Sequence, residues 1–166
     1  MNFTSTLEII ESSQIFKKFI KEHSGAELVA GFFILDLLSG NNQKSLDYKL
    51  DSRIFTFSLD ENNEITFKED RLIEDSKSVP LRKISHAVKI DLDEIPSIAE
   101  KTAIEKGVKN KFQKIIAVLQ IYEGEQAWNL TCMLDAFVIL NILIDSDTGQ
   151  IVKFDRKSMM DFIKKK

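Results

Sequence analysis

The stretch Ile144–Phe154, IDSDTGQIVKF, is either a metal-binding loop or a turn between two strands, and the interpretation of the whole chain depends on which of the two it is. A calcium loop of the EF-hand type needs acidic or amide ligands at its first, third and fifth positions and a glutamate at its twelfth. Counted from Asp145, the fifth position is Gly149 and the twelfth is Arg156, so the metal pattern fails. A β-hairpin explains the same residues, because Asp145 can cap the turn through its side chain and Gly149 can supply a positive φ.

The composition is that of a globular protein: of 166 residues, 43% are hydrophobic and 30% are charged. The net charge of −3 predicts no extended footprint for nucleic acid or for a membrane. The single cysteine, Cys132, excludes an intrachain disulfide framework and a zinc site with several thiolates. One cysteine also fits a reducing compartment.

The first residues, MNFTSTLEIIESSQIF, lack the basic and apolar segments of a signal peptide. The longest apolar run is shorter than the roughly 20 residues that span a bilayer. The sequence therefore predicts a cytoplasmic, soluble protein without membrane insertion.

Hydrophobic periodicity predicts the secondary structure. Helical spacing occurs over Leu7–His23 and Asp93–Lys106, with Asp93 expected as the N-cap and Gly107 as the stop. A short C-terminal helix is expected from Ser158, which forms a capping pair with Asp161. Strands are expected over 26–38, 46–50, 53–60, 64–69, 86–92, 112–122, 127–134, 137–145 and 150–154.

The order of these elements repeats, which predicts the fold class. Phe55–Lys68 can be laid on Leu140–Phe154 with one extra residue in the second turn. We therefore expect an α+β protein with two similar halves, each an amphipathic helix packed on an antiparallel β-sheet, plus the short C-terminal helix. The expected domains are residues 1–78 and 79–166, packed against each other.

The second half resembles the PepSY and PepSY-like domains. The resemblance covers roughly residues 88–155 and rests on an amphipathic helix, an aromatic residue in a strand (Trp128) and the closing hairpin, in which Ile144, Asp145, Thr148, Gly149 and Ile151 match the family pattern. Ser146 and Gln150 depart from it, and the first half shows the pattern only in outline. The resemblance implies a helix packed across an antiparallel sheet, in a chain that binds or inhibits rather than catalyses, and a tandem repeat of that unit.

The residues that could carry chemistry have simpler structural explanations. His23 lies in the last turn of a helix, where a cation is favourable, and His86 lies beside a connection. Cys132 shares a strand face with Trp128, which predicts a small buried side chain rather than a nucleophile. No metal site and no cofactor is expected, and the many carboxylates are expected to be solvated.

The sequence therefore predicts a non-enzymatic binding or protein-interaction module for a peptide, a protein or a small molecule. Trp128 and Tyr48 are the predicted ligand-binding residues, in a groove between the halves near the loop Ser39–Ser45. Two alternatives stay open. One is a structural homodimer formed through the face of Phe137, Ile139 and Leu143, and the other is an enzyme with a site of scattered carboxylates and His86.

Overall fold

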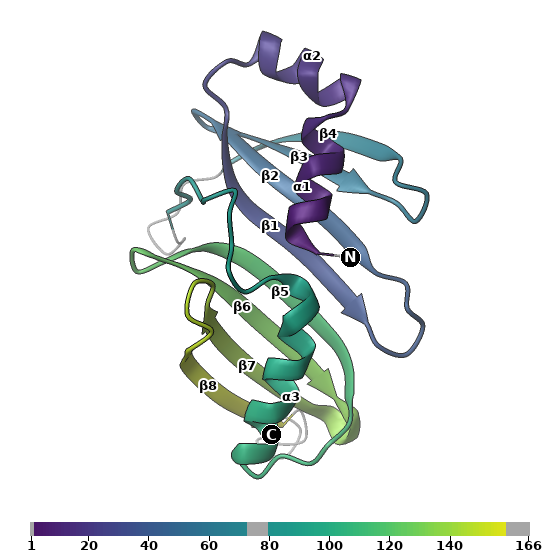
Figure 1. Cartoon of the computed structure of the whole chain (residues 1–166), viewed down its shortest axis with the longest axis vertical. Coiled ribbons are helices and arrows are strands. Elements are labelled where there is room, and N and C mark those ends of the chain that lie inside the picture. Colours follow the sequence, from purple (N-terminus) through teal and green to yellow (C-terminus); the bar gives the residue numbers. More distant parts are fainter. Residues whose placement is uncertain (1, 73–79, 159–166) are drawn as a thin grey trace, which may run out of the picture.

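The structure of this chain, a computed structural model, describes residues 2–72 and 80–158, and its main feature there is one antiparallel sheet of eight strands (Figure 1). The strand order is β4-β3-β2-β1-β5-β6-β7-β8. Each run of four consecutive strands is a meander, and the two meanders meet where β1 pairs with β5. The strands are β1 (Glu27–Asp36), β2 (Gln43–Leu50), β3 (Arg53–Leu59), β4 (Ile65–Arg71), β5 (Phe112–Tyr122), β6 (Glu125–Leu134), β7 (Val138–Asp145) and β8 (Ile151–Ser158).

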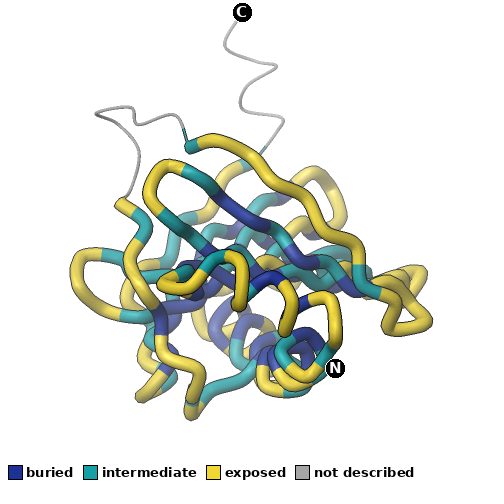
Figure 2. Tube along the Cα trace, turned by 90° about the horizontal axis from the view of Figure 1, so that it is seen from above, coloured by how far each residue is buried: buried dark blue, intermediate teal, exposed yellow. Residues whose placement is uncertain are grey.

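The α-helices are α1 (Phe3–Glu11), α2 (Gln14–Glu22) and α3 (Ile95–Glu105), with short 3-10 turns η1 (Leu92–Glu94) and η2 (Asp135–Phe137). In Figure 1, α1 and α3 lie in front of the sheet and α2 lies at its upper end. The aromatic side chains of α2 pack on the same face of the sheet, where Phe16 contacts Tyr48. Buried residues gather where the strands meet the helices, and exposed residues follow the loops (Figure 2). The opposite face of the sheet, called the open face below, carries no helix among the described residues.

The pairing of β1 with β5 explains why both strands are apolar at nearly every position. Phe33 and Ala117 are partners in this pairing and face the helices, where both are fully buried. Their neighbours Phe32 and Val118 are also partners and point to the open face. A strand in the middle of a wide sheet has neighbours on both edges, so its outward side chains are half-covered as well.

The centre of the core is built from aromatic side chains of both meanders. The ring of Phe3 in α1 makes edge contacts with Phe33 at 6.5 Å and with Trp128 at 6.4 Å. Gly31 lies beneath these rings, and a Cβ there would stand 2.9 Å from Phe33. A side chain at this position would force the aromatic packing apart, so α1 can approach the sheet only over a glycine.

The prediction of two similar halves, each with one helix on its own sheet, is wrong. All eight strands form one continuous sheet, because the edge of β1 hydrogen-bonds with β5 and does not end a separate unit. Local periodicity reports which face of a strand is buried, but it does not report which strand lies beside it. The coarser expectation, a fold with both helices and an antiparallel sheet, is confirmed.

The predicted helix over Leu7–His23 is two helices. The chain breaks at Ser13, whose side chain accepts a hydrogen bond from the amide of Phe16 and caps α2. Serine is among the best N-cap residues, so the pair Ser12–Ser13 was the signal for this break. The N-cap of the later helical segment is Asp91, two residues before the predicted Asp93.

The connection formed by residues 80–91 is hydrogen-bonded to both meanders. It contains no strand, so the prediction of a strand over 86–92 is wrong. The amide of Ile84 donates to the carbonyl of Leu28 in β1, and the amide of Ile90 donates to the carbonyl of Ser146 beyond β7.

The predicted domain boundary between 78 and 79 falls in 73–79, outside the described residues, and stays a prediction.

The hairpin expected in the opening stretch is confirmed. The carboxylate of Asp145 accepts hydrogen bonds from the amides of Asp147 at 2.8 Å and Thr148 at 2.9 Å, and Gly149 has φ of +76°. The short C-terminal helix predicted to begin after Ser158 lies outside the described residues, which end at Ser158, the last residue of β8. Among the described helices, none combines the length and the apolar character needed to cross a bilayer.

Candidate functional site

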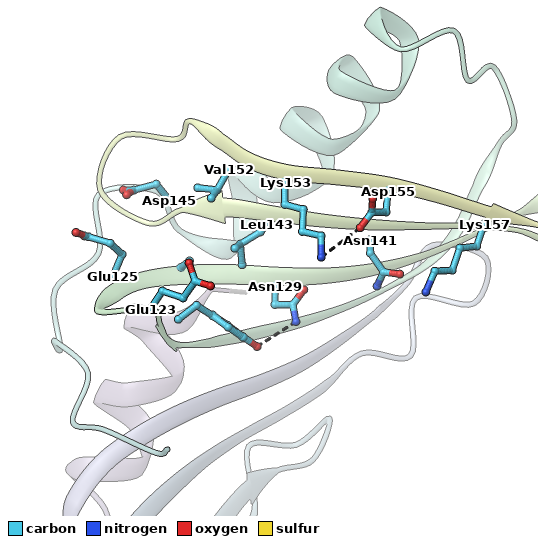
Figure 3. Close-up of a pocket in the computed structure, with 12 residues that line it drawn as sticks. Glu123, Glu125, Asn129, Asn141, Leu143, Asp145, Val152, Lys153, Asp155 and Lys157 are labelled. Carbon is cyan, nitrogen blue, oxygen red and sulfur yellow. Dashed lines mark hydrogen bonds and ion pairs between the residues drawn. The ribbon is translucent and has the colours of Figure 1, made fainter. Parts of the chain in front are cut away.

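The open face carries a hollow of about 620 Å³ over β6, β7 and β8 (Figure 3). Side chains of neighbouring strands lie side by side in it, because Asn129 pairs with Leu143 and Leu143 pairs with Lys153. The next row joins Asn141 to Asp155. The residues that line the hollow are Tyr122, Glu123, Glu125, Ala127, Asn129, Asn141, Leu143, Asp145, Val152, Lys153, Asp155 and Lys157.

The floor of the hollow presents two amide side chains from adjacent strands. Asn129 donates through Nδ2 to the hydroxyl of Tyr122 at 3.0 Å, and Asn141 donates through Nδ2 to Thr131 at 3.4 Å. Each of these bonds uses one of the two N–H donors of the amide. Within the part of the chain described, the Oδ1 atoms of both residues accept no hydrogen bond. Both half-buried amides can therefore accept from, and donate to, a group that enters the hollow.

The charges of the hollow are sorted along its length. Glu123, Glu125 and Asp145 lie toward one end, and Lys157 lies at the other end (Figure 3). Backbone hydrogen bonds from Thr148 and then Asp147 hold the pKa of Asp145 below its ordinary value, so this carboxylate is charged at neutral pH.

Between these ends, Lys153 and Asp155 form an ion pair of 3.4 Å along β8. Both side chains are largely exposed, so the pair contributes little to stability. This ion pair can break at low energetic cost, so the side chains of β8 can rearrange to contact a ligand.

The two predicted ligand-binding residues lie in the core, on the face of the sheet that the helices cover. Trp128 has no exposed surface, and its indole nitrogen donates to the carbonyl of Ile90 at 2.9 Å. Tyr48 is 2% exposed, and its hydroxyl donates to Glu11 at 2.8 Å. The sheet order places β1 and β5 between the strands of Trp128 and Tyr48. Both rings have their polar atoms satisfied within the chain, so neither offers a surface to a ligand in this conformation.

The histidine of the enzyme alternative, His86, meets one carboxylate. Its Nε2 lies 3.2 Å from Oε2 of Glu11, the oxygen that also accepts from Tyr48. This contact ties the connection at 80–91 to α1 and β2. Cys132 is fully buried, and burial raises the pKa of its thiol to about 12, so it is not a thiolate nucleophile at neutral pH.

The three residues of the homodimer alternative, Phe137, Ile139 and Leu143, lie in two different surroundings. Ile139 and Leu143 point to the open face and are half-buried, while Phe137 belongs to the turn η2 and is 66% exposed. Phe137 and Ile139 nevertheless line one depression, and the homodimer stays a prediction.

The polar floor of the hollow was missed from the sequence, although a signal for it exists. Asn141 interrupts the apolar run VILNILI, and Asn129 occupies the outward position between Trp128 and Leu130. An amide on an apolar strand costs stability unless it is hydrogen-bonded or serves a ligand. Amides at neighbouring rows of two adjacent strands would have indicated a polar site, but the strand pairing that brings Asn129 and Asn141 together is not visible in the sequence.

Comparisons with known proteins give a fold and no family. No family model matches the chain, and a search of the curated proteins found no match. Among solved structures, the chain is similar to the crystal structure of a "putative lipoprotein" from Clostridium difficile 630, with a TM-score of 0.60 and 15% sequence identity. The alignment covers 86% of this chain and 90% of that one. At this identity the likeness shows the fold alone, and the PepSY resemblance stays a prediction.

Proposed function

We propose that the chain is a non-enzymatic recognition protein that holds an extended segment of a polypeptide partner in the hollow on its open face. The single observation that carries this proposal is the hollow itself, with two half-buried amides on its floor and sorted charges along its length. Pockets for small molecules are mostly apolar and enclosed. This hollow lies on one face of a sheet, and eight of the twelve residues that line it carry amide or charged side chains.

The geometry suits an extended chain because the hollow follows the direction of β6 and β7. Asn129 and Asn141 stand at neighbouring rows of the sheet, so their spacing is set by the same pleat that spaces the groups of an extended peptide. An amide side chain can accept a hydrogen bond from a peptide N–H and donate one to a peptide C=O. Asn129 and Asn141 can therefore bind the backbone of a peptide without requiring a particular peptide sequence.

The supporting floor is rigid, which favours recognition by a preformed surface. On the other side of the sheet, beneath these amides, Leu130, Cys132, Leu140 and Ile142 are fully buried. A well-packed core holds outward-pointing side chains in place and lowers the entropy lost when a partner binds. The non-enzymatic role agrees with the sequence prediction, and a cytoplasmic location stays a prediction.

Photo-crosslinking tests the proposal. A photoreactive phenylalanine analogue replaces Leu143, on the floor of the hollow, in the full chain expressed in its own cells. The matched control carries the analogue at Ile104, a solvent-exposed position on α3, which covers the other face. We expect Leu143 to capture one defined polypeptide, identified by mass spectrometry, that Ile104 does not capture. Equal capture at both positions, or no polypeptide at Leu143, would overturn the proposal.

A further inference from the structure

Four large apolar side chains are exposed together at one end of the sheet, away from the acidic end of the hollow. Leu37 and Leu38 follow β1 and are 41% and 65% exposed, and Met133 and Phe137 at the end of β6 are 37% and 66% exposed. The amide of Leu37 donates to the carbonyl of Gln113 at 3.0 Å, and Gln113 lines one depression with Met133 and Phe137. These four residues are called the apolar end below.

The turn that carries Phe137 has an unfavourable backbone. Ala136 and Phe137 have φ of +56° and +61°, in the left-handed region that favours glycine. A bulky residue rarely adopts this conformation, and here it leaves the ring in solvent rather than in the core. The turn costs stability and displays an aromatic side chain, which is a feature of recognition sites.

The charges around the apolar end are mainly positive. Lys114 is the cross-strand partner of Met133, and Lys157 is the partner of Ile139. Lys111 is bonded to Asp135 through its amide, and Lys109 lies two residues earlier in the same connection.

The acidic groups nearby are fewer and are engaged in turns. Asp135 accepts from the amide of Lys111, and Asp36 accepts from the amides of Leu38 and Ser39. Asp60 and Glu61 lie on the other side of the β1–β2 loop, where they line a separate depression with Asn41 and Asn42. With Asp60 and Glu61 set apart beyond the β1–β2 loop, four lysines against two aspartates leave a local excess of two positive charges at the apolar end, where Lys114 is also the cross-strand partner of Asp36.

We propose that the apolar end docks on an anionic lipid surface. Phe137 and Leu38 would enter the boundary between headgroups and acyl chains, while the lysines meet the phosphate and carboxylate groups of the lipids. This contact lies on the surface and spans nothing, so it agrees with the lack of a spanning helix among the described residues. It does not depend on the hollow or on the partner proposed above.

The sequence beyond Ser158 has the same chemistry. Ser158 pairs with Val138, the neighbour of Phe137, so the chain leaves the described part at the apolar end. The residues that follow, MMDFIKKK, again combine large apolar side chains with lysines. Stable attachment of a protein to a membrane surface generally needs more than one such signal.

Vesicle co-sedimentation tests the proposal with the full chain. The probes are vesicles of phosphatidylcholine alone and of phosphatidylcholine mixed with phosphatidylserine. We expect binding to the mixed vesicles only, weakened at high salt because the lysine contacts are screened. The double variant Leu38→Ser and Phe137→Ser should lower the bound fraction by about tenfold, and Lys111→Glu with Lys114→Glu should lower it similarly.

The matched control is Ile15→Ser, which removes a side chain that is 44% exposed on α2, near the start of β1, whereas Leu38 follows the other end of that strand. It should leave vesicle binding unchanged, and circular dichroism should be the same for all variants. The proposal is overturned if the protein does not bind the mixed vesicles. It is also overturned if the Leu38 and Phe137 double variant binds them as well as the unchanged chain does. Self-association that the double variant abolishes, without vesicle binding, would also overturn it by assigning the apolar end to a second copy of the chain.

Discussion

The indole nitrogen of Trp128 donates a hydrogen bond of 2.9 Å to the carbonyl oxygen of Ile90, and this bond joins the sheet to the connection between its two meanders. The substitution Trp128→Phe removes the donor and leaves a void beside Phe3 and Phe33. We expect the free energy of unfolding in urea to fall by about 2–4 kcal/mol. Phe137→Leu, at an exposed aromatic, should change it by less than about 0.5 kcal/mol. Equal effects of the two substitutions would contradict the structural role of Trp128.

Asp91 holds the start of two helices at once. Its carboxylate accepts from the amide of Phe3 at 2.7 Å and from the hydroxyl of Thr4 at 2.7 Å, and it also caps η1. Asp91→Ala should lower the free energy of unfolding by about 1–3 kcal/mol, because α1 loses its long-range anchor. Asp93→Ala, two residues later and exposed, is the control and should be within about 0.5 kcal/mol of the unchanged protein. A larger loss at Asp93 would show that the cap is wrongly assigned.

Gly40 and Gly149 have nearly the same positive φ but different surroundings. Substituting each of them therefore distinguishes the cost of backbone strain from the cost of a steric contact. Gly149 has φ of +76° and Gly40 has φ of +77°, but only Gly149 has a neighbour, since an added Cβ would stand 3.3 Å from Ile90. Gly40→Ala should cost about 1 kcal/mol through backbone strain alone. Gly149→Ala should cost more in the same thermal or urea unfolding measurement, because Ile90 must also move. Equal costs would show that the hairpin does not press on the connection.

Asp47, which lies on the open face of the sheet, makes the stability of the protein depend on pH. Burial raises the pKa of Asp47 above its ordinary value, although the hydroxyl of Thr56 donates to it at 2.6 Å. The folded state therefore binds the proton more tightly than the unfolded state, so stability falls as pH rises through the window above the ordinary aspartate pKa. Asp47→Asn should raise the melting temperature at neutral pH, and the gain should disappear in acid. A gain that is the same at all pH values would contradict the raised pKa.

The positions of the strands could be read from the sequence, but their arrangement could not. Alternation in Arg53–Leu59 and the turn residues Asp145 and Gly149 depend on neighbours in the chain, and both were predicted correctly. The pairing of β1 with β5 joins residues about eighty positions apart, and periodicity carries no record of it. For the same reason one sheet was taken for two.

The candidate site was less predictable than the fold because it depends on that pairing. Trp128 and Tyr48 are the conspicuous residues of their strands, and their size places them in the core, where burial is most favourable. Most of the residues that line the hollow carry amide or charged side chains, which are common on the exposed face of a sheet and give no signal one by one. Only the register that sets Asn129 beside Leu143 turns them into a surface.

The most direct measurement of the central claim is the affinity of the polypeptide captured at Leu143 for two variants of the chain. Leu143→Arg fills the floor of the hollow with a bulky charged side chain, whereas Ile104→Arg places the same side chain on α3, on the helix-covered side of the sheet. Binding in the hollow predicts that Leu143→Arg weakens the affinity by at least about tenfold, with a fold unchanged by circular dichroism, while Ile104→Arg has no effect. Unchanged affinity for Leu143→Arg would contradict the claim that the open face is the recognition surface.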